Sequence, residues 1–310
     1  MIIVVGSLNM DLFIRVKRFL HPGESAIGED FHTAFGGKGA NQAYAIAKLG
    51  APANLKTAML GCVGEDNFGD QMVANLQSVG VDTKAILRRE TVASGTAMIT
   101  LDAQGQNQIV IAPGANATLS AADVSAQVQL FRGAQAVVVQ LETTLPAVER
   151  ALLMAREVGA LTILNPAPYA PLSDDLLKLC DYVIPNESEA TQLTGVGVLN
   201  VDSAAAAARM LRSRGARNVL VTLGDKGVWL ESEGYRGHVP AYLVKALDTV
   251  GAGDTFLGGF VVGLLEGSDA NSAAQFGCAA AAIAVTRSGL PTAAGQTKNA
   301  DETIYNGGMG

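Results

Sequence analysis

Segments typical of short buried strands alternate with segments typical of helices along most of this sequence, and this order limits the possible folds more than any other feature. Ile2–Val5 is β-branched, ends at a glycine and is too short for a helix, which is the pattern of a buried parallel strand. Further strands are expected at Leu55–Leu60, Ala136–Leu141, Leu161–Leu164, Tyr182–Ile184 and Asn218–Thr222. Helices are expected at Ala40–Leu49, Gln71–Val79, Leu145–Val158, Ala204–Arg214, Gly253–Leu265 and Ala270–Thr286. This order predicts a three-layer α/β/α fold with a central, mostly parallel sheet, and ligands in such folds bind at the carboxyl ends of the strands.

Two stretches interrupt the alternation and look like β-hairpins. Residues 12–16 and 33–35 flank a turn at Pro22 and Gly23, and residues 96–111 hold two apolar runs around a polar turn. Together these strands could form a small β-sheet that projects from the main body as a lid. Two ordinary hairpins at the edge of the main sheet are an equally good interpretation of the same periodicity.

The length and composition suit one large α/β domain that spans residues 1–310. Of the 310 residues, 49% are hydrophobic, so the core should be substantial. The segment 293–310 is small, polar and rich in glycine, and we expect it to be a poorly ordered tail.

Charge, apolar-run length and cysteine spacing exclude several classes of protein. The net charge is −7, and no run of Lys and Arg supplies the basic face that a nucleic-acid-binding protein needs. The apolar runs at 136–140 and 279–285 are far shorter than the ~20 residues of a membrane-spanning helix. The cysteines have no disulfide or zinc spacing, so we expect reduced, mostly buried thiols at Cys62, Cys180 and Cys278. No basic segment precedes the first strand to mark a signal peptide, and a cytoplasmic protein is expected.

The segment Asp248–Phe256, which runs Asp-Thr-Val-Gly-Ala-Gly-Asp-Thr-Phe, is the most informative part of the sequence. Its glycines precede a long apolar helical pattern, and free N–H groups at the start of a helix bind anions. Gly251 and Gly253, on either side of Ala252, let the backbone come close to a phosphate. Asp254 follows in the first turn, where a carboxylate could accept a hydroxyl proton while the amides stabilise a transferring phosphoryl group. From spacing alone, a favourable charge at the helix start is an equally good interpretation of Asp254.

Two other nucleotide-binding motifs are excluded by single positions. A dinucleotide fingerprint requires glycine where Phe256 stands, and it follows the first strand rather than lying near the C-terminus. A Walker A loop ending at Gly37 and Lys38 requires glycine five residues earlier and Ser or Thr after the lysine, but those positions hold His32 and Gly39. The anion site predicted above therefore belongs to neither class.

Polar side chains near the N-terminus suit the recognition of sugar hydroxyls. Asn9 and Asp11 follow the first strand and lie on one side of an extended chain. Asn41 stands in the Gly36–Gln42 segment, whose glycines let a ligand approach the backbone, and its amide offers both a donor and an acceptor. Taken alone, the first pair could be a capped turn and the second segment a tight turn with a helix cap.

Further candidates follow later strands. Glu142 comes directly after one predicted strand, and Asn186 and Glu189 follow another within five residues. Carboxylates there could orient hydrated Mg²⁺. Solvated acids at helix starts are the alternative interpretation. The turn Thr222–Gly227 lies at another strand end, where a nucleotide could bind, although a plain hairpin turn fits the same residues.

Taken together, these segments resemble the ribokinase-like carbohydrate kinases, also called the phosphofructokinase-B family. Gly36–Gln42 resembles the first family signature, and Asp248–Phe256 resembles the second with its Asp-Thr-x-Gly-Ala-Gly-Asp form intact. Both occur in the family's order, and the resemblance runs from Met1 to about Thr292. It implies an ATP-dependent sugar kinase whose small sheet forms a lid over the sugar and also makes a homodimer contact.

The resemblance also implies roles for individual positions. Asp254 would be the catalytic base, and the anion hole would be formed by Gly251, Ala252 and Gly253. Besides Asp254, the sugar would contact Asn9, Asp11, Gly37, Lys38, Asn41 and Glu142. The ATP site would include Asn186, Thr222, Gly224, Gly227 and Cys278. The family implies Mg²⁺ with the ATP, and a monovalent cation, usually K⁺, at Asp248, Val250, Ala284, Arg287, Gly289 and Thr292.

Two features depart from the family pattern, and a further set of residues favours one substrate. Cys278 stands where many members carry Asn or His beside the nucleotide, and the segment after Gly289 is one residue shorter than in many members. The pair Asn9 and Asp11, together with Gly-Lys-Gly-Ala-Asn, favours phosphorylation of D-ribose to D-ribose 5-phosphate. A kinase for fructose, 2-keto-3-deoxygluconate or a nucleoside is the nearest alternative, and a non-catalytic sugar-binding regulator is the alternative from another class.

Overall fold

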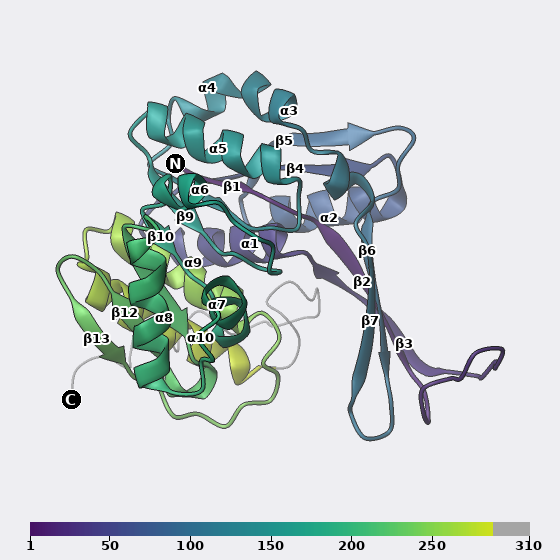
Figure 1. Ribbon diagram of the computed structural model, residues 1–310. Coiled ribbons are helices and arrows are strands. Elements are labelled where there is room, and N and C mark those ends of the chain that lie inside the picture. The colour runs from purple at the N-terminus through teal and green to yellow at the C-terminus, as the bar shows by residue number, and fades with distance from the viewer. Residues whose placement is uncertain (288–310) are drawn as a thin grey trace.

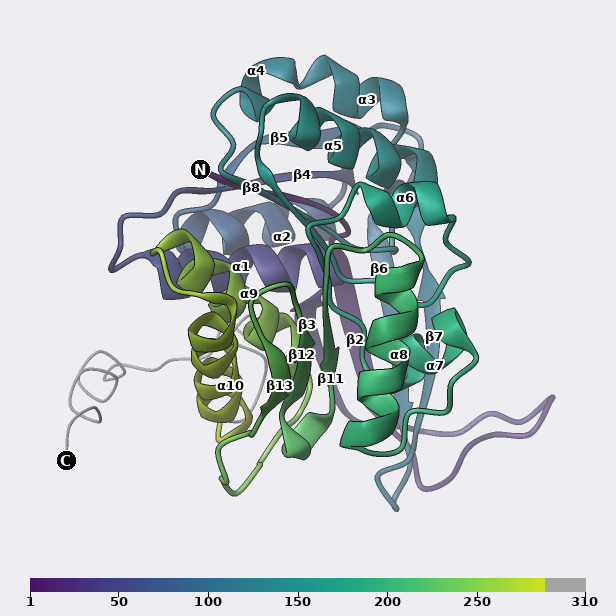
Figure 2. The same ribbon diagram turned by 60° about the vertical axis from the view of Figure 1, so that its left-hand side comes forward.

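The computed structural model describes residues 1–287 and shows a large sheet between two layers of helices, with a smaller sheet projecting from one side (Figures 1 and 2). The strands of the large sheet are β1 (Ile2–Val5), β4 (Thr57–Gly64), β5 (Asp82–Arg89), β8 (Ala136–Val139), β9 (Leu161–Leu164), β10 (Tyr182–Val183), β11 (Asn218–Thr222), β12 (Val228–Glu231) and β13 (Arg236–Val239). Their order is β13-β12-β11-β10-β9-β8-β1-β4-β5. All pairs from β5 to β11 are parallel, whereas β12 and β13 add antiparallel strands at one edge. The predicted mostly parallel sheet is confirmed.

Helices cover both faces of this sheet because its strands are apolar on both sides. In β1, Ile3 and Val5 pack into one hydrophobic cluster and Ile2 and Val4 into the other. The first cluster is covered by α3 (Ala121–Ala126), α4 (Val128–Phe131), α5 (Leu145–Glu157), α6 (Asp174–Lys178), α7 (Glu187–Thr194) and α8 (Val201–Ser213). The second is covered by α1 (Lys38–Gly50), α2 (Asn67–Ser78), α9 (Ala252–Leu265) and α10 (Ala270–Val285). The predicted three-layer α/β/α architecture is therefore confirmed.

The two predicted hairpins form one separate sheet. Its strands are β2 (Asn9–Arg15), β3 (Glu29–Gly36), β6 (Gly95–Leu101) and β7 (Asn107–Ala112), in the order β3-β2-β6-β7. The hairpins are joined because β2 and β6 pair in parallel along their whole lengths. Figure 1 shows this sheet extending away from the helical layers as a lid. The prediction of a small projecting sheet is confirmed, and the alternative of two hairpins on the edge of the main sheet is wrong.

Some strands of the structure were not predicted from the sequence, and one predicted segment lies outside the described residues. The strands β5, β12 and β13 were not predicted, and the predicted tail at 293–310 lies outside the described residues. All three cysteines are buried and unpaired, as predicted. Within residues 1–287, no helix combines the length and apolar character needed to cross a membrane.

Glycines in the second turn of α9 let this helix pack closely against α1 and α10. A Cβ on Gly258 would lie 2.9 Å from the Cβ of Ala45 in α1, and one on Gly259 would lie 2.9 Å from the Cα of Gly277 in α10. Larger side chains at these two positions would push the helices apart. The close packing holds the start of α9 against the start of α1, where predicted site residues from both helices meet.

Candidate active site

Helix α9 begins with a turn that no side chain caps in the described part of the chain. Its N-cap is Gly251, whose φ of 73° is a left-handed conformation that favours glycine. A Cβ on Gly253 would meet nothing within 4 Å, so the first turn borders open space. The N–H of Ala252 donates to the carbonyl oxygen of Thr249 at 3.3 Å, but no side chain of the described residues caps the turn, and the positive end of the helix dipole gives it the geometry that the predicted anion site requires.

Asp254 is the third residue of α9 and is 9% exposed. Its Oδ1 accepts a hydrogen bond from Nε2 of Gln42 at 2.9 Å, and its Oδ2 accepts one from Nδ2 of Asn41 at 3.1 Å. Burial raises the pKa of Asp254, while the charge of Lys38 and the two amide donors oppose that rise. A carboxylate made more basic by burial is suited to accept a proton near neutral pH.

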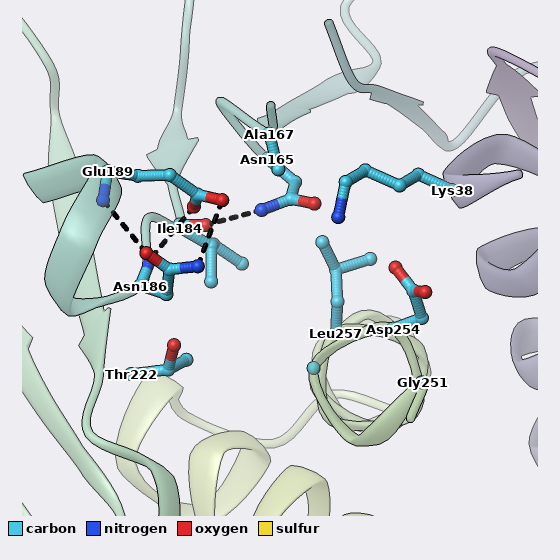
Figure 3. Close-up of a pocket in the computed structure, with 11 residues that line it drawn as sticks. Lys38, Asn165, Ala167, Ile184, Asn186, Glu189, Thr222, Gly251, Asp254 and Leu257 are labelled. Atoms are coloured by element: carbon cyan, nitrogen blue, oxygen red, sulfur yellow. Dashed lines mark hydrogen bonds between the residues drawn. The ribbon is translucent and has the colours of Figure 1, made fainter. Parts of the chain in front are cut away.

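Asp254 lines a cavity of about 210 Å³ at the carboxyl ends of the central strands (Figure 3). Lys38 extends its amine into this cavity from the side of α1, and Leu257 borders it from α9. The structure thereby brings together six residues that the sequence assigned to three different roles: Lys38, Asn186, Thr222, Gly251, Gly253 and Asp254.

The opposite wall of the cavity is held by a capping box at the start of α7. Oδ1 of Asn186 accepts from the backbone N–H of Glu189 at 2.8 Å, and the Glu189 carboxylate accepts from both nitrogens of Asn186 at 2.9 and 3.0 Å. Thr222 is joined to Asn186 by a parallel bridge between β11 and this turn. Burial raises the pKa of Glu189, and its hydrogen bond with Asn186 and the charge of Lys38 oppose the rise. A fixed acidic group therefore faces the cavity across from Asp254.

A second cavity, of about 440 Å³, lies under the lid beside Asn9 and Glu142 and is also lined by Ile111 of β7. Oδ1 of Asn9 accepts a hydrogen bond from Nδ2 of Asn116 at 2.8 Å, so the amide nitrogen of Asn9 is the group that it can offer to a ligand. Oε2 of Glu142 accepts from Oγ of Ser7 at 2.5 Å and from the first backbone N–H of α1 at 2.9 Å. Both predicted sugar-binding side chains are thus held in place at the base of the lid.

Asp11 and two glycines shape the same region. Asp11 lies on β2 against Gly36 of β3, where a Cβ would be 2.3 Å from Oδ2 of Asp11. Gly37 has a φ of 86°, and a Cβ there would be 2.7 Å from the backbone nitrogen of Asn9. Burial, and then the charge of Glu142, raises the pKa of Asp11 to about 7. Asp11 is therefore close enough to Glu142 for the charge of one carboxyl group to act on the other, and hydroxyl donors of a sugar would be favourable there.

Asn41 lines neither cavity but is hydrogen-bonded to Asp254, which lines the first. While its Nδ2 donates to Asp254, its Oδ1 is buried and makes no hydrogen bond to any of the described residues. Buried amide oxygens are usually paired, and an unpaired one beside a carboxylate is suited to accept a hydrogen bond from a bound hydroxyl. This geometry fits the predicted sugar-binding role of Asn41.

Three predicted ATP-site residues line neither of these cavities. Gly224 and Gly227 belong to the turn between β11 and β12, which is a hairpin turn built on a short 3₁₀ segment at Gly224–Lys226. A Cβ on Gly227 would lie 2.1 Å from the carbonyl oxygen of Val239, which gives this glycine a structural requirement of its own. Cys278 is 5% exposed within α10, where burial raises the pKa of its thiol to about 11.

The described part of the predicted monovalent-cation site lies where the loop before α9 meets the end of α10. The backbone N–H of Asp248 donates to the carbonyl oxygen of Val285 at 3.2 Å, and Oδ1 of Asp248 accepts from the N–H of Val250 at 2.9 Å. Two more predicted ligands lie at that helix end, namely Ala284 and Arg287. Two lie outside the described residues, namely Gly289 and Thr292.

Several side chains that hold the site together had no role predicted from the sequence. These are Ser7, Gln42, Asn116, Gln140 and Asn165. The available signal was polarity directly after an apolar strand, because Gln140 follows β8 and Asn165 follows β9. A polar residue at such a position is buried only if it has partners in the fold, and those partners come from distant parts of the chain.

A buried carboxyl group in a cavity at the uncapped start of a helix, together with a second cavity under a lid, is the arrangement expected of an α/β phosphotransferase that acts on a small polyol. The chain belongs to the pfkB family of carbohydrate kinases, because the model of that family matches residues 1–295.

Individual relatives are similar along nearly the whole chain. A ribokinase from Haemophilus influenzae is 43% identical over 286 residues, which cover 92% of each chain. A deoxyribokinase from Salmonella typhi is 38% identical and covers 93% of each chain. Among solved structures, the Arabidopsis thaliana ribokinase complexed with ribose and ATP is 30% identical with a TM-score of 0.87 and covers 93% of each chain.

Proposed function

We propose that this protein transfers the γ-phosphoryl group of ATP to D-ribose and forms D-ribose 5-phosphate. One observation carries the proposal: the buried carboxyl group of Asp254 lines the same cavity as the uncapped start of α9 and is hydrogen-bonded to Asn41. The ribokinase relatives support ribose as the acceptor, and the Arabidopsis structure with ribose and ATP supports ATP as the donor.

In the proposed reaction, Asp254 accepts the proton of the sugar hydroxyl as the hydroxyl oxygen attacks the γ-phosphorus. The new oxygen–phosphorus bond forms while the bond from the γ-phosphorus to the β–γ bridging oxygen breaks, and ADP leaves with that oxygen. Backbone amides of Gly251, Ala252 and Gly253 stabilise the negative charge on the transferring group. Lys38 adds a positive charge to the same cavity.

The sugar would bind between the lid and α1. Asn9 would donate from its amide nitrogen, while Asp11 and Glu142 would accept from sugar hydroxyls. Asn41 would accept at its unpaired Oδ1 from a neighbouring sugar hydroxyl, and the reacting hydroxyl, whose proton goes to Asp254, would then lie next to that carboxylate. Gly37 and Lys38, at the start of α1, would bring the backbone close to the sugar.

The nucleotide would extend from the first cavity over the turn after β11. Asn186 and Thr222 would lie nearest the phosphates, because both line the cavity that Asp254 lines. Gly224 and Gly227 would form the wall at the hairpin turn, and we place Cys278 on the adenine side from α10.

Two ions complete the proposal, and the donor groups present fit both. Mg²⁺ would be oriented mainly through waters and ATP phosphates by Glu189, whose carboxylate lines the cavity, and when bound it would neutralise charge on the phosphates. K⁺ would be held by oxygen donors at the start of α9 and the end of α10, contributed by Asp248, Val250, Ala284, Arg287, Gly289 and Thr292. The hydrogen bond from Asp248 to Val285 holds these two segments together, and oxygen donors suit a hard cation.

We also propose that two chains associate through their lids. The lid strands β3, β6 and β7 carry exposed apolar side chains, with Phe31 65%, Met98 61% and Val110 67% exposed. Exposed apolar groups on a sheet favour contact with a second copy. The three unpaired thiols fit a protein of the cytoplasm, where cysteines are kept reduced.

The function is tested by measuring ADP release with a panel of acceptors: D-ribose, 2-deoxy-D-ribose, D-fructose, 2-keto-3-deoxygluconate and adenosine. The deoxyribokinase relative makes 2-deoxy-D-ribose the most discriminating alternative. The proposal expects the highest kcat/KM with D-ribose. A higher kcat/KM with another acceptor would reassign the substrate, and sugar binding without any ADP release would indicate a regulator.

A further inference from the structure

Two buried glutamines connect the carboxyl group of Asp254 to the central sheet. Nε2 of Gln42 donates to Oδ1 of Asp254 at 2.9 Å and also to Oδ1 of Asn165 at 3.0 Å. Oε1 of Gln42 accepts from Nε2 of Gln140 at 2.5 Å. Both glutamine side chains are 0% exposed. The contacts therefore form a continuous chain from the end of β8, through α1, to the start of α9.

The direction of these hydrogen bonds is set by the two ends of the chain. Asp254 offers an acceptor when it is ionised, and Asn165 also presents its oxygen, because its Nδ2 donates to the carbonyl oxygen of Ile184 at 2.8 Å. Gln42 must therefore turn its amide nitrogen toward both of them. Its oxygen then needs a donor on the other side, and Gln140 supplies that donor.

Gln140 keeps this orientation although one of its own groups is left unpaired. Its Oε1 is buried and has no hydrogen-bond partner among the described residues. That oxygen occupies the space beside Gly6, where a Cβ would lie only 2.0 Å away. Turning the Gln140 amide around would place its oxygen against the oxygen of Gln42. Leaving a buried oxygen unpaired costs free energy. The hydrogen bond that Gln140 donates to Gln42 must therefore stabilise the fold by more than this cost.

We propose that Gln42 and Gln140 are positioning residues for the phosphoryl-transfer reaction: Gln140 fixes the orientation of the Gln42 amide, and Gln42 holds the carboxyl group of Asp254 in place and ionised. This inference rests on the proposed function, in which Asp254 is the base. Neither glutamine touches the substrate, and both act through Asp254.

Other charges around Asp254 set the background on which the glutamines act. Lys38 of α1 favours the ionised carboxylate, while Glu142, after β8, disfavours it, and Glu189 of α7 is a further acidic neighbour. Burial is the largest influence and raises the pKa of Asp254. Removing the Gln42 donor takes away one of the few groups that stabilise the charged form, so the pKa should rise further. Because the base must be ionised, the acidic limb of the kcat–pH profile should then move to higher pH.

The test is the kinetics of Gln42→Met and Gln140→Met with ribose and ATP, measured across pH. Gln42→Met should lower kcat by about 10- to 100-fold, the value of one hydrogen bond to a charged group, and shift the acidic limb upward. Gln140→Met should lower kcat by about 2- to 10-fold with a shift in the same direction, since it removes a bond between neutral groups. Ribose affinity, measured by calorimetry without ATP, should stay within about threefold of the unsubstituted protein.

Combining each glutamine substitution with Asp254→Asn distinguishes a positioning role from a general structural effect. In the Asp254→Asn background, neither glutamine substitution should reduce the residual rate further. Asn218→Leu is the matched control, because it removes another buried amide. That amide donates to the carbonyl oxygen of Asp181, away from the site. The control substitution should lower thermal stability without moving the acidic limb of the kcat–pH profile.

The positioning role would be overturned if the acidic limb of the kcat–pH profile did not move. It would also be overturned if the glutamine substitutions lowered the rate equally in the Asp254→Asn background. If Gln42→Met does not fold, Gln140→Met provides the same test. A kcat that Asp254→Asn leaves unchanged would instead remove the proposed base itself, whatever the glutamines do.

Discussion

Lowering the pH from 8 to 6 should weaken ribose binding through Asp11. Burial and the charge of Glu142 raise the pKa of Asp11 to about 7, so this carboxyl group changes its charge within the working range of the enzyme. An ionised carboxylate accepts stronger hydrogen bonds from sugar hydroxyls than a protonated one does. Ribose should therefore bind the ionised form, and its affinity should fall as the pH drops through the pKa.

The size of this effect follows from the fraction ionised. With a pKa of about 7, about nine-tenths of the Asp11 groups are ionised at pH 8 and about one-tenth at pH 6, so the dissociation constant should rise by about tenfold. Calorimetric titration of ribose without ATP measures this directly and leaves the transfer step out. Asp11→Asn should bind ribose more weakly and lose the pH dependence, whereas Asp254→Asn should keep it. Affinity that is equal at the two pH values in the unsubstituted protein would show that ionised Asp11 does not strengthen ribose binding.

Three further perturbations test other parts of the account. Gly37→Ala should cost about 1–3 kcal/mol of unfolding free energy and weaken ribose binding, since φ is 86° there and the new Cβ would lie 2.7 Å from the backbone nitrogen of Asn9; urea unfolding and calorimetry measure both effects. Asp248→Ala should abolish any increase in kcat on replacing Na⁺ with K⁺, and a K⁺ response that survives would move the cation site elsewhere. Val110→Glu should shift the protein from dimer to monomer in analytical ultracentrifugation because it places a charge on the lid, and an unchanged dimer would exclude this contact.

Local sequence was sufficient for the elements that carry the anion site. Gly251, Gly253 and Asp254 lie within four positions of one another, and the start of a helix depends on just such a short segment. The apolar strands β1, β8, β9 and β11 were also predicted, because a strand buried on both faces has a continuous hydrophobic sequence. Their carboxyl ends then correctly indicated where polar side chains would gather.

The missed strands lie toward the edges of the large sheet. In β5, polar and charged residues flank an apolar run of only three residues, 85–87, so the segment lacks the longer apolar run of a central strand. The strands β12 and β13 reverse direction at the other edge, and periodicity does not encode that reversal.

The support around the base was beyond sequence reasoning for a different reason. Gln42 and Gln140 are 98 positions apart, and Gln42 and Asp254 are 212 apart. Their contact depends on the strand order, which places β8 next to β1, and on the close packing of α9 against α1. A single sequence shows neither the order of the strands nor the distance between the two helices, although polar side chains at these positions are compatible with the hydrogen bonds.

The central claim is that the carboxyl group of Asp254 takes the proton of the sugar hydroxyl. The most direct measurement is kcat for ribose phosphorylation by Asp254→Asn, with ribose affinity determined on the same preparation. If Asp254 is the base, kcat should fall by about 10²- to 10⁴-fold, the usual contribution of a general base, while ribose binding is largely retained. A variant that phosphorylates ribose as fast as the unsubstituted protein would contradict it.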